Sequence, residues 1–132
     1  MTQVLIIDDD AAIRETLRFV FEDAGYEVVE APDGAVALQL LHATSVGLVA
    51  LLDNVMPGLD GVEVIERLEA EGVGFLPPPH AYMLITASPQ RISPALAQRL
   101  QRLGVPVLSK PFDLDTLLAV VARLAGGLRA AS

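Results

Sequence analysis

Cysteine is absent from this 132-residue sequence, which excludes disulfide bonds and metal sites built on thiolates. Long apolar runs are also missing, because none approaches the roughly 20 residues that a membrane-spanning helix requires. The N-terminus lacks the basic segment and the apolar core that form a secretion signal. We therefore expect a soluble protein that stays in the cytoplasm.

Positive charge is scarce, with 9 basic against 17 acidic side chains and a net charge of −8. A surface of this sign repels the phosphate backbone of nucleic acids, so direct nucleic-acid binding is not expected. Histidine is scarce too, since only His42 and His80 occur in the chain. Neither lies near the strand ends at which the acidic residues gather. Zinc and copper, which prefer histidine or cysteine ligands, are therefore disfavoured as the metal bound there.

Apolar residues, by contrast, make up 52% of the chain and charged residues only 20%, a balance that argues against disorder. The length suffices for one domain with a sizeable core and not for two of ordinary size. We expect one domain over residues 1–125 and a short C-terminal tail over residues 126–132.

Five short segments have the composition of strands, over residues 4–7, 26–31, 48–53, 81–86 and 105–108. The third, Leu48 to Asp53, has five apolar residues followed by one carboxylate, which is typical of a strand buried on both faces of a parallel sheet. The second alternates polar and apolar residues, as an edge strand does. The first, third and fourth are the most apolar and should be central.

Helical patterns separate these segments. Pro32-Asp33-Gly34 breaks the second strand before a short helix. Expected N-terminal signals of the other helices are Asp10, Asp60 with Glu63, Ser93-Pro94 and Asp113, and expected stops are Gly25, Gly104 and Gly126-Gly127. In the third helix we expect Val62, Ile65 and Leu68 to face inward. Five strands alternating with five helices predict an α/β fold with helices on both faces of a parallel sheet. The strand order 2-1-3-4-5 satisfies the burial pattern and puts the reversal between the first and third strands.

Acidic residues follow two of the strands that meet at this reversal. Asp8, Asp9 and Asp53 should converge there, and such carboxylates repel one another unless a cation neutralises them. Mg²⁺ is the cation that best suits oxygen ligands of this kind. The alternative is that Asp10 is only a helix cap and that Asp8 and Asp9 are solvated loop residues.

Two further polar residues end strands at the same edge. Thr86 offers a hydroxyl and Lys110 an ammonium group, and Pro111 is suited to hold Lys110 in an unusual backbone geometry such as a cis bond. A carboxylate nucleophile, a metal, a hydroxyl and a fixed positive charge suit phosphoryl transfer, in which catalysis is mostly positioning and charge neutralisation.

With these residues in this order, the chain resembles the receiver domain of bacterial two-component response regulators. The resemblance covers Val4 to about Leu124 and rests on Ile7-Asp8-Asp9-Asp10, Leu52-Asp53, Met56-Pro57-Gly58-Leu59-Asp60-Gly61, Thr86-Ala87 and Lys110-Pro111-Phe112. It implies a flavodoxin-like (βα)5 fold for a receiver domain over residues 1–125.

The resemblance also implies roles for the site residues. Asp53 would accept a phosphoryl group from a phosphohistidine, and Asp9, Asp53 and the main-chain carbonyl of Val55 would bind Mg²⁺, with Asp8 acting through a bound water. Thr86 and Lys110 would contact the phosphoryl oxygens. The implied domain is no enzyme beyond its own phosphorylation and dephosphorylation.

The implied partners are a sensor histidine kinase or phosphotransfer protein and a downstream protein or output domain. A second copy could bind the face made by the fourth helix, the fifth strand and the fifth helix, where Arg91, Arg99 and Arg102 gather. A solvated mixed-charge surface explains these arginines equally well. Too few residues follow Gly127 for an output domain, so the chain is either a stand-alone receiver or a segment of a larger regulator or hybrid kinase.

Three features depart from the family pattern. Val107 stands where receivers usually carry Tyr or Phe, which puts an aromatic relay in doubt. The proline-rich segment 75–80 is unusual, and we interpret it as a loop variation at the end of the fourth strand away from the site. Val55 and Ser88 occupy positions that tune water access, and the apolar Val55 favours slow hydrolysis of the phosphorylated form.

Three other functions fit parts of this pattern. A flavodoxin-like cofactor binder would need a phosphate-cradling loop where Asp8-Asp9-Asp10 stands. An aspartate-nucleophile phosphohydrolase would carry a second acid two residues after its nucleophile, where this chain has Val55. A receiver-like interaction module that is never phosphorylated is disfavoured because every residue type of the acceptor site is present.

Overall fold

The computed structural model describes residues 2–71 and 80–131. The proline-rich loop interpreted above lies outside the described residues, except for His80. Five parallel strands form one sheet, β1 (Gln3–Ile7), β2 (Glu27–Ala31), β3 (Leu48–Asp53), β4 (Ala81–Thr86) and β5 (Val107–Ser109). Their order is β2-β1-β3-β4-β5, so the predicted order is confirmed.

Burial follows this order, as the composition of the strands predicts. All six residues of β3 are buried, and four of the five in β1 are. The edge strand β2 is mostly half-buried, and β5, at the opposite edge, has three residues, all exposed or half-buried. A strand flanked on both sides and covered on both faces must be apolar throughout, which is why Leu48 to Asp53 could be recognised from sequence.

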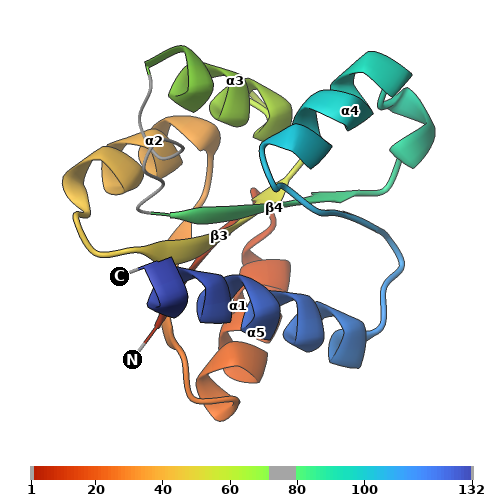
Figure 1. Ribbon diagram of the computed structural model, residues 1–132. Coiled ribbons are helices and arrows are strands. Elements are labelled where there is room, and N and C mark those ends of the chain that lie inside the picture. The colour runs from red at the N-terminus through yellow and green to blue at the C-terminus, as the bar shows by residue number, and fades with distance from the viewer. Residues whose placement is uncertain (1, 72–79, 132) are drawn as a thin grey trace.

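Five α-helices cover the sheet, α1 (Ala11–Asp23), α2 (Gly34–Ala43), α3 (Gly61–Glu71), α4 (Pro94–Arg102) and α5 (Leu114–Ala131), and a short 3-10 turn, η1 (Pro89–Arg91), precedes α4. Figure 1 shows α2, α3 and α4 on one face of the sheet and α1 and α5 on the other. Right-handed crossovers that run in opposite directions along a sheet cover opposite faces, so the reversal of direction after β2 puts α1 on one face and α2, α3 and α4 on the other.

Side-chain caps start the helices where the sequence predicts. Asp10 accepts from the amides of Ala12 and Ile13. Asp60 and Glu63 form a reciprocal capping box, with the Glu63 amide donating to Asp60 Oδ1 at 2.8 Å and the Asp60 amide donating to Glu63 Oε1 at 3.3 Å. These caps fix where two loops of the acidic edge turn into helices.

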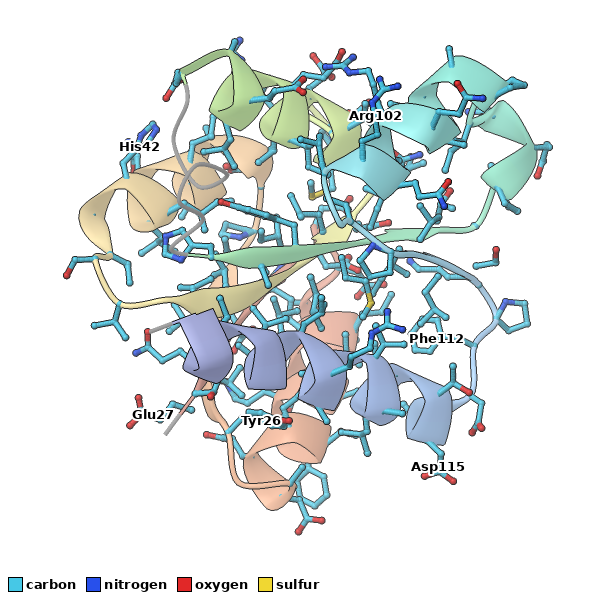
Figure 2. The ribbon with its side chains drawn as sticks, in the orientation of Figure 1. Tyr26, Glu27, His42, Arg102, Phe112 and Asp115 are labelled. Atoms are coloured by element: carbon cyan, nitrogen blue, oxygen red, sulfur yellow. The ribbon has the colours of Figure 1, made fainter. Side chains whose placement is uncertain are left out.

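Two apolar cores lie on the two sides of the sheet. One joins the sheet to α2, α3 and α4, and the other joins it to α1 and α5. Side chains fill the space between the sheet and both helical layers in Figure 2. In the second core Phe21 packs against Tyr26 edge to face, with ring centroids 5.9 Å apart, where α1 turns toward β2.

Two glycines permit close approaches around the loop that follows β3. A Cβ atom at Gly61 would lie 2.8 Å from the main-chain oxygen of Asp53 and 2.7 Å from Leu84. A Cβ atom at Gly34 would lie 2.6 Å from the main-chain oxygen of Leu59. The absence of side chains therefore lets α2 and α3 start directly against the segment that carries Asp53.

Two details of the sequence prediction were wrong. The fifth strand begins at Val107 and not at Val105, because the Val105 amide donates to Leu100 at the end of α4 and Pro106 has no N–H. Helix α5 continues through Gly126 and Gly127 to Ala131, since a helical glycine costs only about 1 kcal/mol. In α3, Ile65 and Leu68 are buried and Val62 packs half-buried against the core, as expected, and Val64 is buried beside them.

His80 joins three elements at the end of the sheet away from the acidic residues. Its Nδ1 accepts from the Leu48 amide at 3.2 Å, and its Nε2 lies 3.1 Å from the Leu41 carbonyl oxygen. Only 2% of the residue is exposed. Within the described part of the chain, no helix combines the length and apolar character needed to cross a membrane.

Candidate functional site: an acidic cluster at the strand ends

The register of the sheet brings the polar strand ends together. Ile7 of β1 pairs with Leu52 of β3, so the next residues along both strands, Asp8 and Asp53, lie side by side where these strands end. On the other side of β3, Asp53 pairs with Ile85, and the Asn54 amide donates to the Ile85 carbonyl oxygen at 2.8 Å. The predicted meeting of these strand ends is confirmed.

The carboxylates of Asp8, Asp9 and Asp53 offer oxygens that all lie within 4.8 Å of one another. Asp8 and Asp53 are buried, with 5% and 9% of each residue exposed, whereas Asp9 is exposed. Two buried acids beside a solvent-facing third form a cluster that is open on one side. A small polar or charged group can therefore reach it from water.

The environment of Asp8 disfavours its charged form. Burial raises the pKa of the Asp8 carboxyl, and the neighbouring carboxylates of Asp53 and Asp9 raise it as well. The amide of Asp10, which donates to Asp8 Oδ1 at 2.9 Å, and the ammonium group of Lys110 both act in the opposite direction. The acids at this edge thus repel one another and are only partly compensated by the protein.

Lys110 supplies the positive charge nearest to Asp53. Its Nζ lies 3.5 Å from Asp53 Oδ1, longer than a tight ion pair, and its side chain is 27% exposed. Its amide donates to the Thr86 carbonyl oxygen at 2.8 Å, which ties the end of β5 to the end of β4. The peptide bond between Lys110 and Pro111 is cis, as the sequence suggests.

Thr86 is completely buried at the end of β4. Its Oγ1 accepts from the Ser88 amide at 2.9 Å, so the hydroxyl oxygen is already engaged with the loop that leads to η1. A hydroxyl can still donate its proton while its oxygen accepts. Any group that attracts this proton would pull on the same loop.

Val55 begins the loop after β3. Its amide faces Asp53 Oδ1 at 3.5 Å, and 56% of the residue is exposed. Gly58 turns this loop with a φ of +77°, a conformation that favours glycine. The capping box of Asp60 and Glu63 then closes the loop, so Val55 is held between two fixed points.

The donor set fits a hard cation. Mg²⁺ binds oxygens at roughly 2.0–2.1 Å, so two ligands of one ion stand roughly 3–4 Å apart. Carboxylate oxygens within 4.8 Å of one another need only a small inward movement to reach that spacing. Neither histidine is at this edge, since His80 lies at the opposite end of β4 and His42 projects from α2 (Figure 2).

One pair of residues at the site was missed from sequence. Arg14 of α1 donates to the main-chain oxygen of Asp8 and also pairs with Glu30 of β2. The only signal was two arginines four residues apart on the polar side of α1, Arg14 and Arg18. Glu30 could not be identified as their partner from sequence, because the pairing depends on how α1 packs against β2.

Comparisons with known proteins agree with this geometry. A family model described as response regulator receiver domain matches residues 4–122. The transcriptional regulatory protein FixJ of Bradyrhizobium diazoefficiens is 36% identical over 119 residues, which are 89% of this chain and 54% of FixJ. The response regulator MprA of Mycolicibacterium vanbaalenii is 38% identical over 117 residues, 89% of this chain and 47% of MprA. The chain thus spans about half the length of these curated relatives.

Solved structures share the fold over nearly the whole chain. A CheY-like response regulator receiver domain protein from Methanospirillum hungatei has a TM-score of 0.81 at 31% identity, covering 98% of both chains. The response regulator TrrA from Thermotoga maritima, solved in complex with Mg(2+)-BeF, has a TM-score of 0.72 at 26% identity, covering 94% of this chain and 99% of TrrA.

Proposed function

This chain belongs to the response regulator receiver domain family, and from that membership we propose that it accepts a phosphoryl group on Asp53 from the phosphohistidine of a sensor kinase or phosphotransfer protein. The observation that carries the proposal is the convergence of three carboxylates and one ammonium group at one strand-end edge, with Lys110 facing Asp53. Its catalysis is limited to its own phosphorylation and dephosphorylation.

In the proposed transfer, an Asp53 carboxylate oxygen attacks phosphorus in line. A bond between oxygen and phosphorus forms while the bond between phosphorus and the imidazole nitrogen breaks, and that nitrogen keeps the electron pair and then takes a proton from water. The product is an acyl phosphate on Asp53. The buried position of Asp53 limits the access of water to this bond.

We assign the metal site to Asp8, Asp9, Asp53 and the main-chain carbonyl of Val55. Mg²⁺ bound there would neutralise the acids and hold a phosphoryl oxygen. The mutual spacing of the three carboxylates supports the assignment, as does the Mg²⁺ complex of TrrA. Lys110 and Thr86 contact the remaining phosphoryl oxygens, and the new charge draws both of them inward.

Movement of Thr86 provides the link to a partner surface. The loop bonded to Thr86 leads through η1 to α4, and a hollow of about 380 Å³ between α4 and α5 is lined by Ala97, Leu100, Gln101, Gly104, Val105, Pro106, Val107 and Arg123. We propose this face for binding a downstream protein, an output domain or a second copy. Among the three arginines near α4, Arg99 is paired with Glu66 and Glu69 of α3.

We further propose that residues 1–125 form the receiver domain and that residues 126–132, which continue α5 as far as Ala131, form its C-terminal tail. We also propose that the protein acts in the cytoplasm. The family match over residues 4–122 supports the first boundary. A cytoplasmic kinase domain and its receiver must share a compartment for direct phosphoryl transfer.

The central test is Asp53→Asn. Incubation of the purified chain with acetyl phosphate and Mg²⁺ should add one phosphoryl group to the wild type and none to this variant, as read by intact-mass spectrometry. Asp10→Asn is the matched control, because asparagine is an equally good helix cap and Asp10 lies outside the metal cluster. We expect it to be labelled like the wild type.

Two outcomes would contradict the proposal. Labelling of Asp53→Asn at one site, as in the wild type, would move the acceptor elsewhere. Release of many equivalents of phosphate from a simple phosphate ester would instead favour a phosphohydrolase.

A further inference from the structure

Arg14 connects helix α1 to the main chain of the acidic cluster. Its Nη1 donates to the main-chain oxygen of Asp8 at 2.7 Å, and its Nε donates to Glu30 Oε1 at 3.1 Å. The Arg14 side chain is 17% exposed, so both bonds are partly shielded from water. A guanidinium carries five N–H donors in a rigid plane, and here the Nε and Nη1 donors reach two different partners.

Glu30 is held from a second side. Arg18 Nε donates to Glu30 Oε2 at 2.6 Å, and Arg18 also reaches Glu22 at 3.3 Å. The hydrogen bond from Arg18, followed by the contacts with Arg14, lowers the pKa of the Glu30 carboxyl. Glu30 therefore stays ionised, and both of its oxygens are used to orient arginines.

The Asp8 oxygen belongs to the planar peptide unit that joins Asp8 to Asp9. The amide of Asp8 donates to the Ala31 carbonyl oxygen at 3.2 Å, and the amide of Asp10 donates to the Asp8 carboxylate at 2.9 Å. With Arg14 on the intervening oxygen, the backbone is held on both sides of Asp9. The starting direction of the exposed Asp9 side chain is thereby set.

Position, and not charge, is what Arg14 contributes to the cluster. The positive charges of Arg14 and Arg18 are already matched by Glu30 and Glu22, which lie within ion-pair distance of them. Lys110, in contrast, faces Asp53 directly and has its charge open to the acids. The two cations thus act on the same cluster in different ways.

We propose that Arg14, oriented by Glu30, is a positioning residue that preorganises Asp8 and Asp9 for Mg²⁺. The inference rests on the proposed function, because it presumes that the acidic cluster binds this ion. Groups that orient metal ligands commonly change metal affinity by about 10-fold to 100-fold when they are removed. A positioning role predicts an effect of this size in the unphosphorylated chain.

The test is titration of the unphosphorylated chain with Mg²⁺ by isothermal calorimetry, with circular dichroism as a check on folding. We expect Arg14→Gln to weaken Mg²⁺ binding by about 10-fold or more. Arg18→Gln is the matched control, because Arg18 shares Glu30 with Arg14 and makes no bond to Asp8. It should keep an affinity close to that of the wild type.

Arg14→Lys separates geometry from charge and also serves if Arg14→Gln does not fold. Lysine keeps the charge and loses the fork, so we expect it to weaken Mg²⁺ binding too. Wild-type affinity in Arg14→Gln or in Arg14→Lys, or an equal loss in Arg18→Gln, would overturn the role of Arg14. Absence of Mg²⁺ binding by the wild type would instead overturn the metal site of the proposed function.

Discussion

At the scale of single residues, His80 shows how one side chain fixes its own charge state. The Leu48 amide donates to Nδ1, so this nitrogen must be unprotonated, and Nε2 must carry the proton that faces the Leu41 carbonyl. Burial lowers the pKa of His80, while hydrogen bonds to the main chain of Leu41 and Thr44 oppose the shift. The neutral ring is the form that joins β3, β4 and α2.

This environment predicts a loss of stability in mild acid. Below about pH 6.5 the unfolded chain protonates His80 and the folded chain does not, so the free energy of unfolding should fall as pH drops from about 6.5 toward the lowered pKa. The slope can reach about 1.4 kcal/mol per pH unit. Urea unfolding between pH 7.5 and pH 5 measures it.

The variant that checks this prediction is His80→Asn. It should be less stable than the wild type at pH 7.5 and should lose most of the slope between pH 6.5 and pH 5. His42→Asn is the control, because His42 is exposed on α2 and pairs only with Glu71 among the described residues. An unchanged slope in His80→Asn would show that other groups cause the acid sensitivity.

At the scale of secondary structure, the start of α3 is set by contact with β3. Gly61 is buried directly behind Asp53, and its neighbours on that side are a main-chain oxygen and the Leu84 side chain. Backbone cannot move aside as a flexible side chain can. The geometry of the loop between Asp53 and Asp60 therefore depends on a missing methyl group.

Gly61→Ala should destabilise the fold by about 1–3 kcal/mol, since the added Cβ forces backbone to shift in a packed interior. It should also slow the phosphorylation of Asp53 by acetyl phosphate, because the shift starts at the Asp53 carbonyl. Gly126→Ala is the opposite case, a helical glycine with open space around it, and should stabilise by about 0.5–1 kcal/mol. Thermal unfolding of both variants decides, and equal effects would contradict the steric account.

How far each element could be predicted depends on what determines it. The strand from Leu48 to Asp53 and the capping box at Asp60 are determined by residues that are close together in the sequence, and both were predicted correctly. The end of α5 was not, because packing carries the helix past two glycines whose local preference is weak. The start of β5 was missed because the Val105 amide is used by α4, a contact that local composition does not show.

At the scale of the whole molecule, the site is a meeting of distant parts, and that governs what the sequence can reveal. Convergence of Asp8, Asp9, Asp53 and Lys110 followed from the strand order alone, since parallel strands all end at one edge. The Arg14 and Glu30 pair did not follow, because it depends on the angle at which α1 crosses β2. The predicted topology therefore showed where the acidic side chains meet, whereas the residues that orient them, Arg14 and Glu30, could be identified only from the structure.

Binding of Mg²⁺ should stabilise the entire fold, because the unfolded chain does not hold the acids together. At about 100 times the dissociation constant, the free energy of unfolding should rise by about 2.7 kcal/mol, and a chelator should reverse the rise. Asp8→Asn keeps an acceptor for the Asp10 amide and removes one of the repelling charges. We expect this variant to unfold at a higher temperature than the wild type in chelator and to gain little from Mg²⁺.

Thermal melts at several Mg²⁺ concentrations measure both effects. NaCl at equal ionic strength serves as the control for general screening of charge. A wild-type melting temperature that does not respond to Mg²⁺ would contradict the metal site, and one that responds equally in Asp8→Asn would contradict the part given to Asp8.

The division of the interior into two cores has a consequence for how the molecule comes apart. Along β3 the side chains alternate between them, with Leu48, Ala50 and Leu52 in one and Val49 and Leu51 in the other, and β1 and β4 alternate in the same way. Each central strand therefore contributes side chains to both cores. Neither core can be exposed to solvent while the other stays packed, because the same strands form both. Unfolding by a protease or by a pulling force should therefore cross a single all-or-none barrier.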